Sequence, residues 1–393
     1  MTAGEHAGEQ RSEERPRDAN PREDDPHGSP RPDGPRVVAL GGGHGLAASL
    51  AALRRVAADL TAVVTVADDG GSSGRLRTEL GVLPPGDLRQ ALAALCRDDE
   101  WGRTWAEVVQ HRFVSSGELH GHALGNLLIV ALWERLGGDV VAALDWVGRL
   151  LGAQGRVLPM SEVPLDIAAT VRGADPSDPD AVTVVRGQVA AATTPGTVLG
   201  ITLTPERPPA CAAALAAVRA ADWAVLGPGS WFTSVLPHLQ VPDLATALQE
   251  TAGRRMLVLN LEQQAGETTG YTAEAHVEVL LAHAPGLRLD VVLADPRSVV
   301  DEAALAEVVA AAGGQLVVAD VSSSRPHIHD PDKLAEAFRA VFASTPRRPT
   351  SEQPGPSAAA APASAAAAPA SAAAAPTSAA STPLPLRGAD TWR

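Results

Sequence analysis

Paired carboxylates, two hydroxyls and a guanidinium follow one another in the stretch Asp68-Asp69-Gly70-Gly71-Ser72-Ser73-Gly74-Arg75. The N–H groups of Gly70 and Gly71, the hydroxyls of Ser72 and Ser73, and the Arg75 side chain are the donors that typically surround a bound phosphate. Asp68 and Asp69 end an apolar run, where carboxylate oxygens can hold Mg²⁺ together with water. The stretch predicts a phosphate site with Mg²⁺ as candidate cofactor. The alternative is an acidic turn whose side chains cap backbone N–H groups.

A glycine-rich turn precedes this stretch. Val37–Leu40 is typical of a buried strand, and Gly42, Gly43, His44 and Gly45 then lead into an apolar helical pattern. A strand, glycines and a helix in this order present backbone N–H groups to phosphate. Residues 43–48 also fit the pattern G-x-G-x-x-A, with Asp68 about where a ribose-binding acid would stand, so an NAD-type cofactor is an alternative. A turn that binds no ligand is another.

Two later segments extend the candidate site. Trp223–Leu226 is followed by Gly227, Gly229, Ser230, Thr233 and Ser234, which predicts a second phosphate cradle at a helix start. Asp87 is expected to cap the N-terminus of a helix that begins at Leu88, with Arg89 facing the ligand from its first turn. The two cradles together suit a crevice that grips both ends of a phosphorylated ligand.

Three further side chains are candidates for ligand contact. His122 and Asn126 are spaced i,i+4 at the start of a long apolar helix, so they share one polar spot for a ligand or for neighbouring loops. A zinc site at His120 and His122 is disfavoured because no carboxylate or cysteine stands beside them. Tyr271, the single tyrosine, lies in a loop where its ring could stack on a base or sugar, or simply pack.

Between residues 36 and 343, short Val/Leu/Ala strands alternate with helices, as in a sheet covered on both faces. The expected strands are Arg36–Leu40, Thr61–Ala67, Thr197–Leu203, Trp223–Leu226, Arg255–Asn260, Leu289–Leu293 and Gln315–Val321. The expected helices are Leu46–Ala57, Leu88–Cys96, His122–Leu136, Val140–Leu151, Ala210–Ala220, Leu244–Glu250, Ala273–His283, Glu302–Ala311 and Lys333–Phe342. Asp166–Arg172 and Ala181–Gly187 are expected to form an antiparallel hairpin. The fold class is α/β, doubly wound and mostly parallel, with a small antiparallel insertion.

The composition of the chain excludes several classes of partner and binding site. A net charge of −14 argues against nucleic acid as the main partner, and the single lysine, Lys333, excludes a P-loop lysine. Cys96 and Cys211 are expected to be buried thiols, and no apolar run is long enough to span a membrane, so a cytoplasmic location is expected. Residues 1–35 and the Ala/Pro/Ser-rich residues 344–393 are expected to be disordered. Their Ser and Thr side chains could accept phosphate from a Ser/Thr kinase, and a homo-oligomer is compatible with the sequence.

The blocks from Val37 to Phe342 resemble the gluconeogenesis factor family (YvcK-like), within the superfamily of 2-phospho-L-lactate transferase. The most specific are Val66–Arg77, Leu83–Asp87, Gly121-His122 with Gly125–Leu128, Gly227–Ser230, and Gly266–Thr268 with Gly270–Thr272. The resemblance implies a cytosolic Rossmann-like protein that binds UDP-sugars such as UDP-N-acetylglucosamine and supports cell shape and wall synthesis under gluconeogenic growth. It also implies nucleotide and metal contacts at the glycine turn, Asp68, Asp69 and Gly227–Ser234, and a sugar-nucleotide contact at Tyr271.

Two positions depart from the family pattern. His44 stands where a threonine is usual, and Ile328-His329-Asp330 lacks the arginine that often precedes this histidine. Arg325 is the candidate substitute. The sequence predicts a nucleotide-sugar-binding regulator without turnover, because no nucleophile–base pair is evident. The alternative is a Mg²⁺-dependent transferase of a phospho-acyl group from a nucleotide donor, with Asp68 or Asp69 holding the metal.

Overall fold

The core of the protein is a seven-stranded parallel sheet with the strand order β10-β9-β8-β7-β1-β2-β3. The structure, a computed structural model, describes residues 33–345 except residues 176, 265 and 326, so the expected terminal extensions lie almost wholly outside it. The strands are β1 Arg36–Gly41, β2 Asp59–Val64, β3 Arg156–Pro159, β7 Trp223–Leu226, β8 Arg254–Val258, β9 Val291–Ala294 and β10 Gln315–Val318. The predicted α/β fold class is confirmed.

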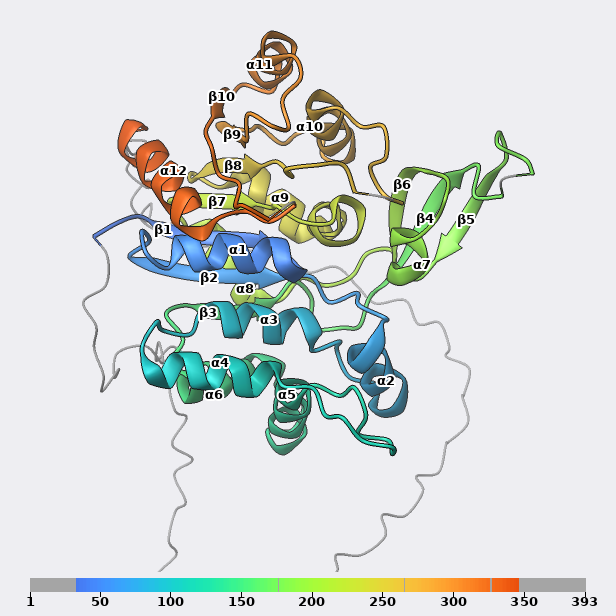
Figure 1. Ribbon diagram of the computed structural model, residues 1–393, viewed down its shortest axis with the longest axis vertical. Helices are drawn as coiled ribbons and strands as arrows, with labels where there is room; N and C mark the ends of the chain where they lie inside the picture. The colour runs from blue at the N-terminus through green and yellow to red at the C-terminus, as the bar shows by residue number, and fades with distance from the viewer. Residues whose placement is uncertain (1–32, 176, 265, 326, 346–393) are drawn as a thin grey trace, which may run out of the picture. The chain divides into compact units, whose positions relative to one another are not determined.

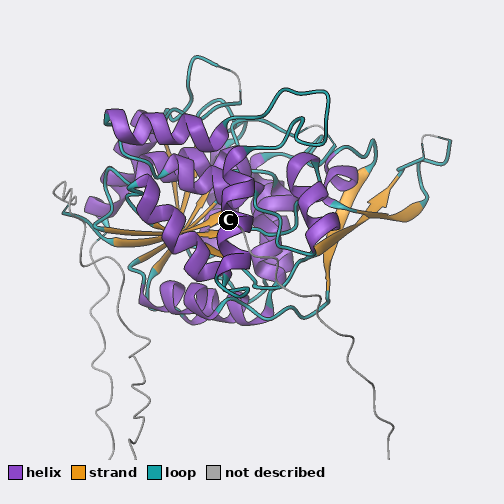
Figure 2. Cartoon of the chain, turned by 90° about the horizontal axis from the view of Figure 1, so that it is seen from below, coloured by secondary structure: helices purple, strands orange, loops and turns teal. Residues whose placement is uncertain are grey.

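Helices lie on both sides of this sheet (Figure 2). The helix α1 (Gly43–Leu53) contacts α3 (Gly86–Ala94) and α12 (Pro331–Ser344), whereas α8 (Ala212–Ala220) contacts α9 (Pro242–Glu250). The remaining α-helices are α2 Gly71–Leu80, α4 Glu100–Gln110, α5 Leu124–Arg135, α6 Val140–Leu151, α7 Gln188–Ala192, α10 Ala273–His283 and α11 Glu302–Ala311. A π-helix, η1 (Trp231–Val235), and a 3-10 helix, η2 (Leu236–Gln240), follow β7. Apart from the edge strand β10, the strands of this sheet are almost fully buried, which explains their continuous Val/Leu/Ala composition.

A second, three-stranded antiparallel sheet interrupts the main one, with the order β5-β4-β6. It consists of β4 (Asp166–Arg172), β5 (Val182–Arg186) and β6 (Thr197–Thr204), and Figure 1 shows it to one side of the main sheet. The predicted hairpin is β4 and β5. The predicted strand Thr197–Leu203 is β6, which pairs with β4 and not with the main sheet.

The strand order reverses at β1. Successive strands β1, β2 and β3 run one way across the sheet, and β7 to β10 run the other way. In doubly wound sheets, ligands bind outside the carboxyl ends of the strands at this switch point. The turns after β1 and β7, which are the two glycine-rich turns predicted to bind phosphate, flank this switch point. Strand β3, the helices α2, α4 and α7, and the 3-10 helix η2 are elements that the sequence pattern did not predict.

Candidate functional site

The two glycine-rich turns touch each other at the carboxyl edge of the sheet. A Cβ atom at Gly45 would lie 2.3 Å from the carbonyl oxygen of Pro228 and 2.6 Å from the Cα atom of Gly229, so only glycine allows this approach. The Ser49 hydroxyl donates to the Gly227 carbonyl at 3.0 Å. Loops predicted to share one edge therefore do share it.

The first turn also contacts α3. A Cβ atom at Gly42 would lie 2.6 Å from Asp87 Oδ2 and 3.2 Å from Ser234 Oγ, and the Gly43 N–H donates to the Asp87 carboxylate. Gly43 has a φ of 58°, a left-handed conformation that favours glycine. His44 is exposed in the first turn of α1.

A polar pocket of about 210 Å³ opens between the starts of α2 and α3. Its lining residues are Asp68, Gly70, Gly71, Ser72, Ser73, Gly86, Asp87, Arg89, Gln90 and Arg112. Gly71 begins α2, so the predicted phosphate loop is in fact a helix N-terminus whose free N–H groups and dipole favour an anion. The Ser73 hydroxyl accepts the Gly86 N–H at 3.0 Å, which joins the starts of the two helices.

Two carboxylates share this pocket, but they are Asp68 and Asp87 and not the adjacent pair Asp68 and Asp69. Asp69 accepts the N–H groups of Gln188 at 3.1 Å and Val189 at 3.0 Å, so it caps the N-terminus of α7. Asp87 is not the helix cap predicted from sequence, because α3 begins at Gly86 and its N-cap, Pro85, makes no side-chain hydrogen bond. Burial, and then the negative charge of Asp68, raise the pKa of Asp87 to about 7.

Arginine supplies the positive charge of the pocket. Arg89 is 3% exposed, and burial followed by the neighbouring Arg112 charge lowers the pKa of Arg89 to about 10, so it stays charged at neutral pH. Arg89 Nε and Gln90 Oε1 are buried without a hydrogen-bond partner among the described residues. Buried polar groups without partners are rare in folded proteins and point here to a ligand surface. Arg89 was predicted to face a ligand, whereas Arg112 and Gln90 were not singled out because each is isolated in sequence from any motif.

His122 and Asn126 meet at Ser72. Asn126 Nδ2 donates to Ser72 Oγ at 3.0 Å, and Ser72 Oγ lies 3.0 Å from His122 Nδ1. Ser72 Oγ also accepts the Ala123 N–H at 3.4 Å, so both of its lone pairs are used and its hydroxyl proton is directed at His122 Nδ1. Burial and the Arg75 charge lower the pKa of His122, which keeps the ring neutral and able to accept. The predicted shared polar spot therefore orients a hydroxyl at the start of α2.

Arg75 turns away from the pocket. Its guanidinium donates to the carbonyl oxygens of Glu118 at 3.1 Å and His120 at 2.7 Å, and the residue is exposed. In this geometry Arg75 holds the loop before α5, so Arg89 and Arg112 are the arginines placed for a phosphate.

The second glycine turn already binds a carboxylate side chain of the protein itself. The carboxylate of Glu267, 4% exposed, accepts the hydroxyls of Ser230 and Thr233 and the N–H of Phe232. Gln264 accepts the Trp231 N–H at 3.2 Å, and Asn260 exchanges hydrogen bonds with the backbone of Gly229 at 2.9 Å. The donors predicted to hold a second phosphate are thus engaged by Glu267. Glu267 stands in the Gly266–Thr272 motif, but nothing in the sequence showed that it reaches back to this turn.

Ser234 and Tyr271 are also engaged within the fold. The Thr65 hydroxyl donates to the Ser234 carbonyl at 2.9 Å, and Ser234 Oγ lies close to Gly42. The Tyr271 hydroxyl donates to the Val198 carbonyl in β6 at 3.1 Å, and its ring packs edge-on against Phe232 and His276. Tyr271 lies outside the lining of the pocket, and its proposed contact with a base or sugar stays a prediction.

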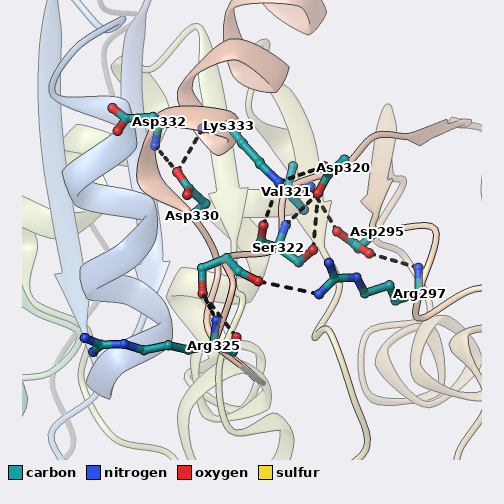
Figure 3. A network of polar contacts seen from close by, with 10 residues as sticks. Asp295, Arg297, Asp320, Val321, Ser322, Arg325, Asp330, Asp332 and Lys333 are labelled. Atoms are coloured by element: carbon teal, nitrogen blue, oxygen red, sulfur yellow. Dashed lines mark hydrogen bonds and ion pairs between the residues drawn. The ribbon is translucent and has the colours of Figure 1, made fainter.

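Polar groups also gather where β9 and β10 end (Figure 3). Asp295 accepts the N–H of Val321 at 2.9 Å, and Lys333 donates to Asp320 at 2.7 Å. Arg325, the candidate substitute for the missing family arginine, is exposed and points away from Asp295 and Asp320 (Figure 3). His329 is buried nearby, and burial lowers its pKa to about 4. This network stabilises the loop before α12 and contributes no lining residue to the pocket.

The pocket has limited capacity for a metal ion. Among the described residues, no group of three or more His, Cys, Asp or Glu side chains could hold a metal ion. Mg²⁺ is nevertheless commonly bound through one or two carboxylates, water and substrate phosphates. Asp68 and Asp87, facing two arginines, fit an ion of this kind that arrives with a diphosphate.

Comparison with known proteins shows the family of this chain. A sequence profile of the 2-phospho-L-lactate transferase CofD family matches residues 37–342, which include every lining residue of the pocket. The chain belongs to the CofD family. Among similar proteins, a Mycobacterium tuberculosis H37Rv protein assigned as a gluconeogenesis factor is 53% identical over 310 residues, covering 78% of this chain and 90% of that protein. The gluconeogenesis factor of Bacillus subtilis 168 is 36% identical over 268 residues, covering 68% and 81%.

The fold of this CofD-family chain also matches a solved structure. A crystal structure of a UPF0052 family member from Bacillus halodurans aligns with a TM-score of 0.69 and 32% identity, covering 79% of this chain and 99% of that one. None of the helices within residues 33–345 that the structure describes is long and apolar enough to cross a membrane.

Proposed function

We propose that this protein is a gluconeogenesis factor that binds the diphosphate of a nucleotide sugar, of the UDP-N-acetylglucosamine type, in the pocket between α2 and α3. The observation that carries the proposal is the buried Arg89, whose Nε has no partner among the described residues, beside Arg112 and the N-terminus of α2. A diphosphate supplies the acceptor oxygens that these donors lack. The glycines of the Gly42–Gly45 turn bring backbone N–H groups to the same edge.

The biological role rests on family resemblance. Relatives that share most of this chain are named gluconeogenesis factors. In line with them, the protein is proposed to act in the cytoplasm as a ligand-sensing regulator of cell shape, wall synthesis and central carbon metabolism, without turning its ligand over.

Binding can be tested by calorimetric titration with UDP-N-acetylglucosamine, UDP, GDP and NAD, each with and without Mg²⁺. Tight binding of the UDP-sugar is expected, and Arg89→Gln should weaken it by roughly 10- to 100-fold through the loss of a charge-assisted hydrogen bond. Arg339→Gln on the exposed face of α12 is the matched control and should bind as the native protein does. Equal affinity of the Arg89 and Arg339 variants would place the ligand elsewhere, and preference for NAD would favour the dinucleotide reading.

A second function is favoured by one specific observation, the pair Asp68 and Asp87 within a family named for a transferase. Two carboxylates that face arginines can hold Mg²⁺ while the arginines stabilise charge on a transferred phosphate. The protein would then move a phospho-acyl group from a nucleotide donor. Release of free nucleotide in the presence of Mg²⁺, a nucleoside-diphosphate donor and an acceptor, abolished by Asp68→Asn, would support the transferase; its absence with bound ligand would support the regulator.

A further inference from the structure

The strand β5 forms a free edge of the small sheet. It pairs with β4 on one side, and its other side carries no strand among the residues that the structure describes. Figure 1 shows β5 on the outer side of β4, away from the main sheet. Val182 is 55% exposed and Val184 is 60% exposed on this edge. Free edges of this kind are usually protected from pairing with another strand by proline, lysine or a bulge. β5 contains neither residue, and its register with β4 shows no shift.

The hydrogen-bond pattern shows which backbone groups of β5 are free. Gly187 donates to the Ile167 carbonyl at 2.8 Å, and Gly173 donates to the Ala181 carbonyl at 2.9 Å, at the two ends of one continuous antiparallel register. Bonded and non-bonded pairs alternate in such a ladder. Thr183 and Val185 therefore bond to β4, whereas the N–H and C=O groups of Val182, Val184 and Arg186 point to the free edge.

Charge along this edge is arranged so that it complements itself. Asp180 precedes β5 and Arg186 ends it, and both are exposed and make no ion pair among the described residues. Two copies of the edge in antiparallel orientation bring the acidic end of each opposite the basic end of the other. Any other partner would need to supply the same charges in reverse order, whereas a second copy of the chain supplies them by symmetry.

We propose that β5 is a self-association edge, at which it pairs antiparallel with β5 of a second copy about a twofold axis at Thr183. In this register Val182 faces Val184 of the second copy, Arg186 faces Asp180, and Thr183 faces its own counterpart. All of the outward-pointing backbone groups of Val182 and Val184 are then paired. Apolar, Thr–Thr and opposite-charge pairs directly across two strands are each stabilising. The result is one continuous antiparallel sheet through both copies.

Cysteine cross-linking tests the register in the full-length chain. Directly opposed residues in a non-bonded antiparallel pair lie about 4.5 Å apart at Cα, within the range of a disulfide. Thr183→Cys should therefore cross-link to itself under mild oxidation. Val184→Cys should not, but a mixture of Val182→Cys and Val184→Cys chains should cross-link. The native Cys96 and Cys211 are buried and do not compete. Self-linking of Val184→Cys in preference to Thr183→Cys would overturn the proposed pairing.

A charge swap tests the interface independently, by sedimentation equilibrium of the full chain. Arg186→Asp places two carboxylates opposite each other at both ends and should weaken dimerisation several-fold, and Asp180→Arg combined with Arg186→Asp should restore it. Leu199→Lys, on the opposite edge strand β6 of the same sheet, is the control and should leave the dimer intact. A native chain that stays monomeric, or a dimer unaffected by Arg186→Asp, would refute the proposal.

Discussion

The two glycine-rich turns at the carboxyl edge of the sheet have similar sequence patterns. They differ in whether nearby polar groups find hydrogen-bond partners within the protein. Both follow a buried strand, and both present backbone N–H groups at a helix start, but only the turn after β7 adds hydroxyls. At the turn after β7, Glu267 accepts the hydroxyls of Ser230 and Thr233 and the N–H of Phe232, so these three donors need no ligand. In the pocket beside the turn after β1, Arg89 Nε and Gln90 Oε1 have no partner among the described residues. The two regions therefore differ in whether the protein itself supplies partners for their polar groups, which the glycine pattern does not show.

Removing the internal carboxylate is the strongest test of this contrast. Glu267→Ala leaves two hydroxyls and the Phe232 N–H without their acceptor, so it should lower the free energy of unfolding by about 3–5 kcal/mol. Urea denaturation measures the loss. Glu267→Gln keeps the shape and one acceptor, and should cost less. A loss under about 1 kcal/mol for the alanine variant would mean that Glu267 does not close this turn.

In the pocket, the raised pKa of Asp87 can be tested through the pH dependence of protein stability. Its folded pKa of about 7 lies above the ordinary value of 3.8, so its protonated form stabilises the native state. That stability is fully present below pH 3.8 and is lost as pH rises through about 7. Asp87→Asn should therefore stabilise the ligand-free protein at pH 8 by up to roughly 4 kcal/mol, with little gain at pH 4. Thermal melts across this pH range check the sign; an equal shift at both pH values would argue against a raised pKa.

The smallest expected effect concerns the boundary of the pocket. Asp69→Ala removes the cap of α7 and should cost about 1 kcal/mol of stability, as should Asp301→Ala at the start of α11. Only the Asp69 variant should also weaken nucleotide-sugar binding, because Gly70 lines the pocket and packs against Val189 of α7. Calorimetry on the two variants separates capping from site geometry. Equal affinities would show that α7 has no part in shaping the pocket.

Sequence patterns predicted most of the fold because buried parallel strands leave continuous apolar runs, and glycines mark the turns that follow them. β3 was missed because its apolar run is only two residues long, Val157 and Leu158, between Arg156 and Pro159. The predicted strand Thr197–Leu203 did not reveal its partner, since a strand pattern carries no information on which sheet the strand joins.

The candidate site was predicted in part. Asp68, Ser72, Ser73 and Arg89 do line one pocket, as their spacing around strand ends indicated. Spacing could not show that Asp69 caps α7 or that Arg75 binds the Glu118 carbonyl, because those partners come from distant segments. The role of Glu267 was hidden for the same reason. Long-range pairing decides which polar side chains remain available to a ligand.

The single lysine allows selective chemical labelling of the protein. Lys333 lies in the network of Figure 3, with its side chain 40% exposed and outside the pocket lining. An amine-reactive fluorophore has this one side chain as its target, apart from the terminal amine. A dye attached there would report on ligand titrations and subunit exchange without touching the groups under study.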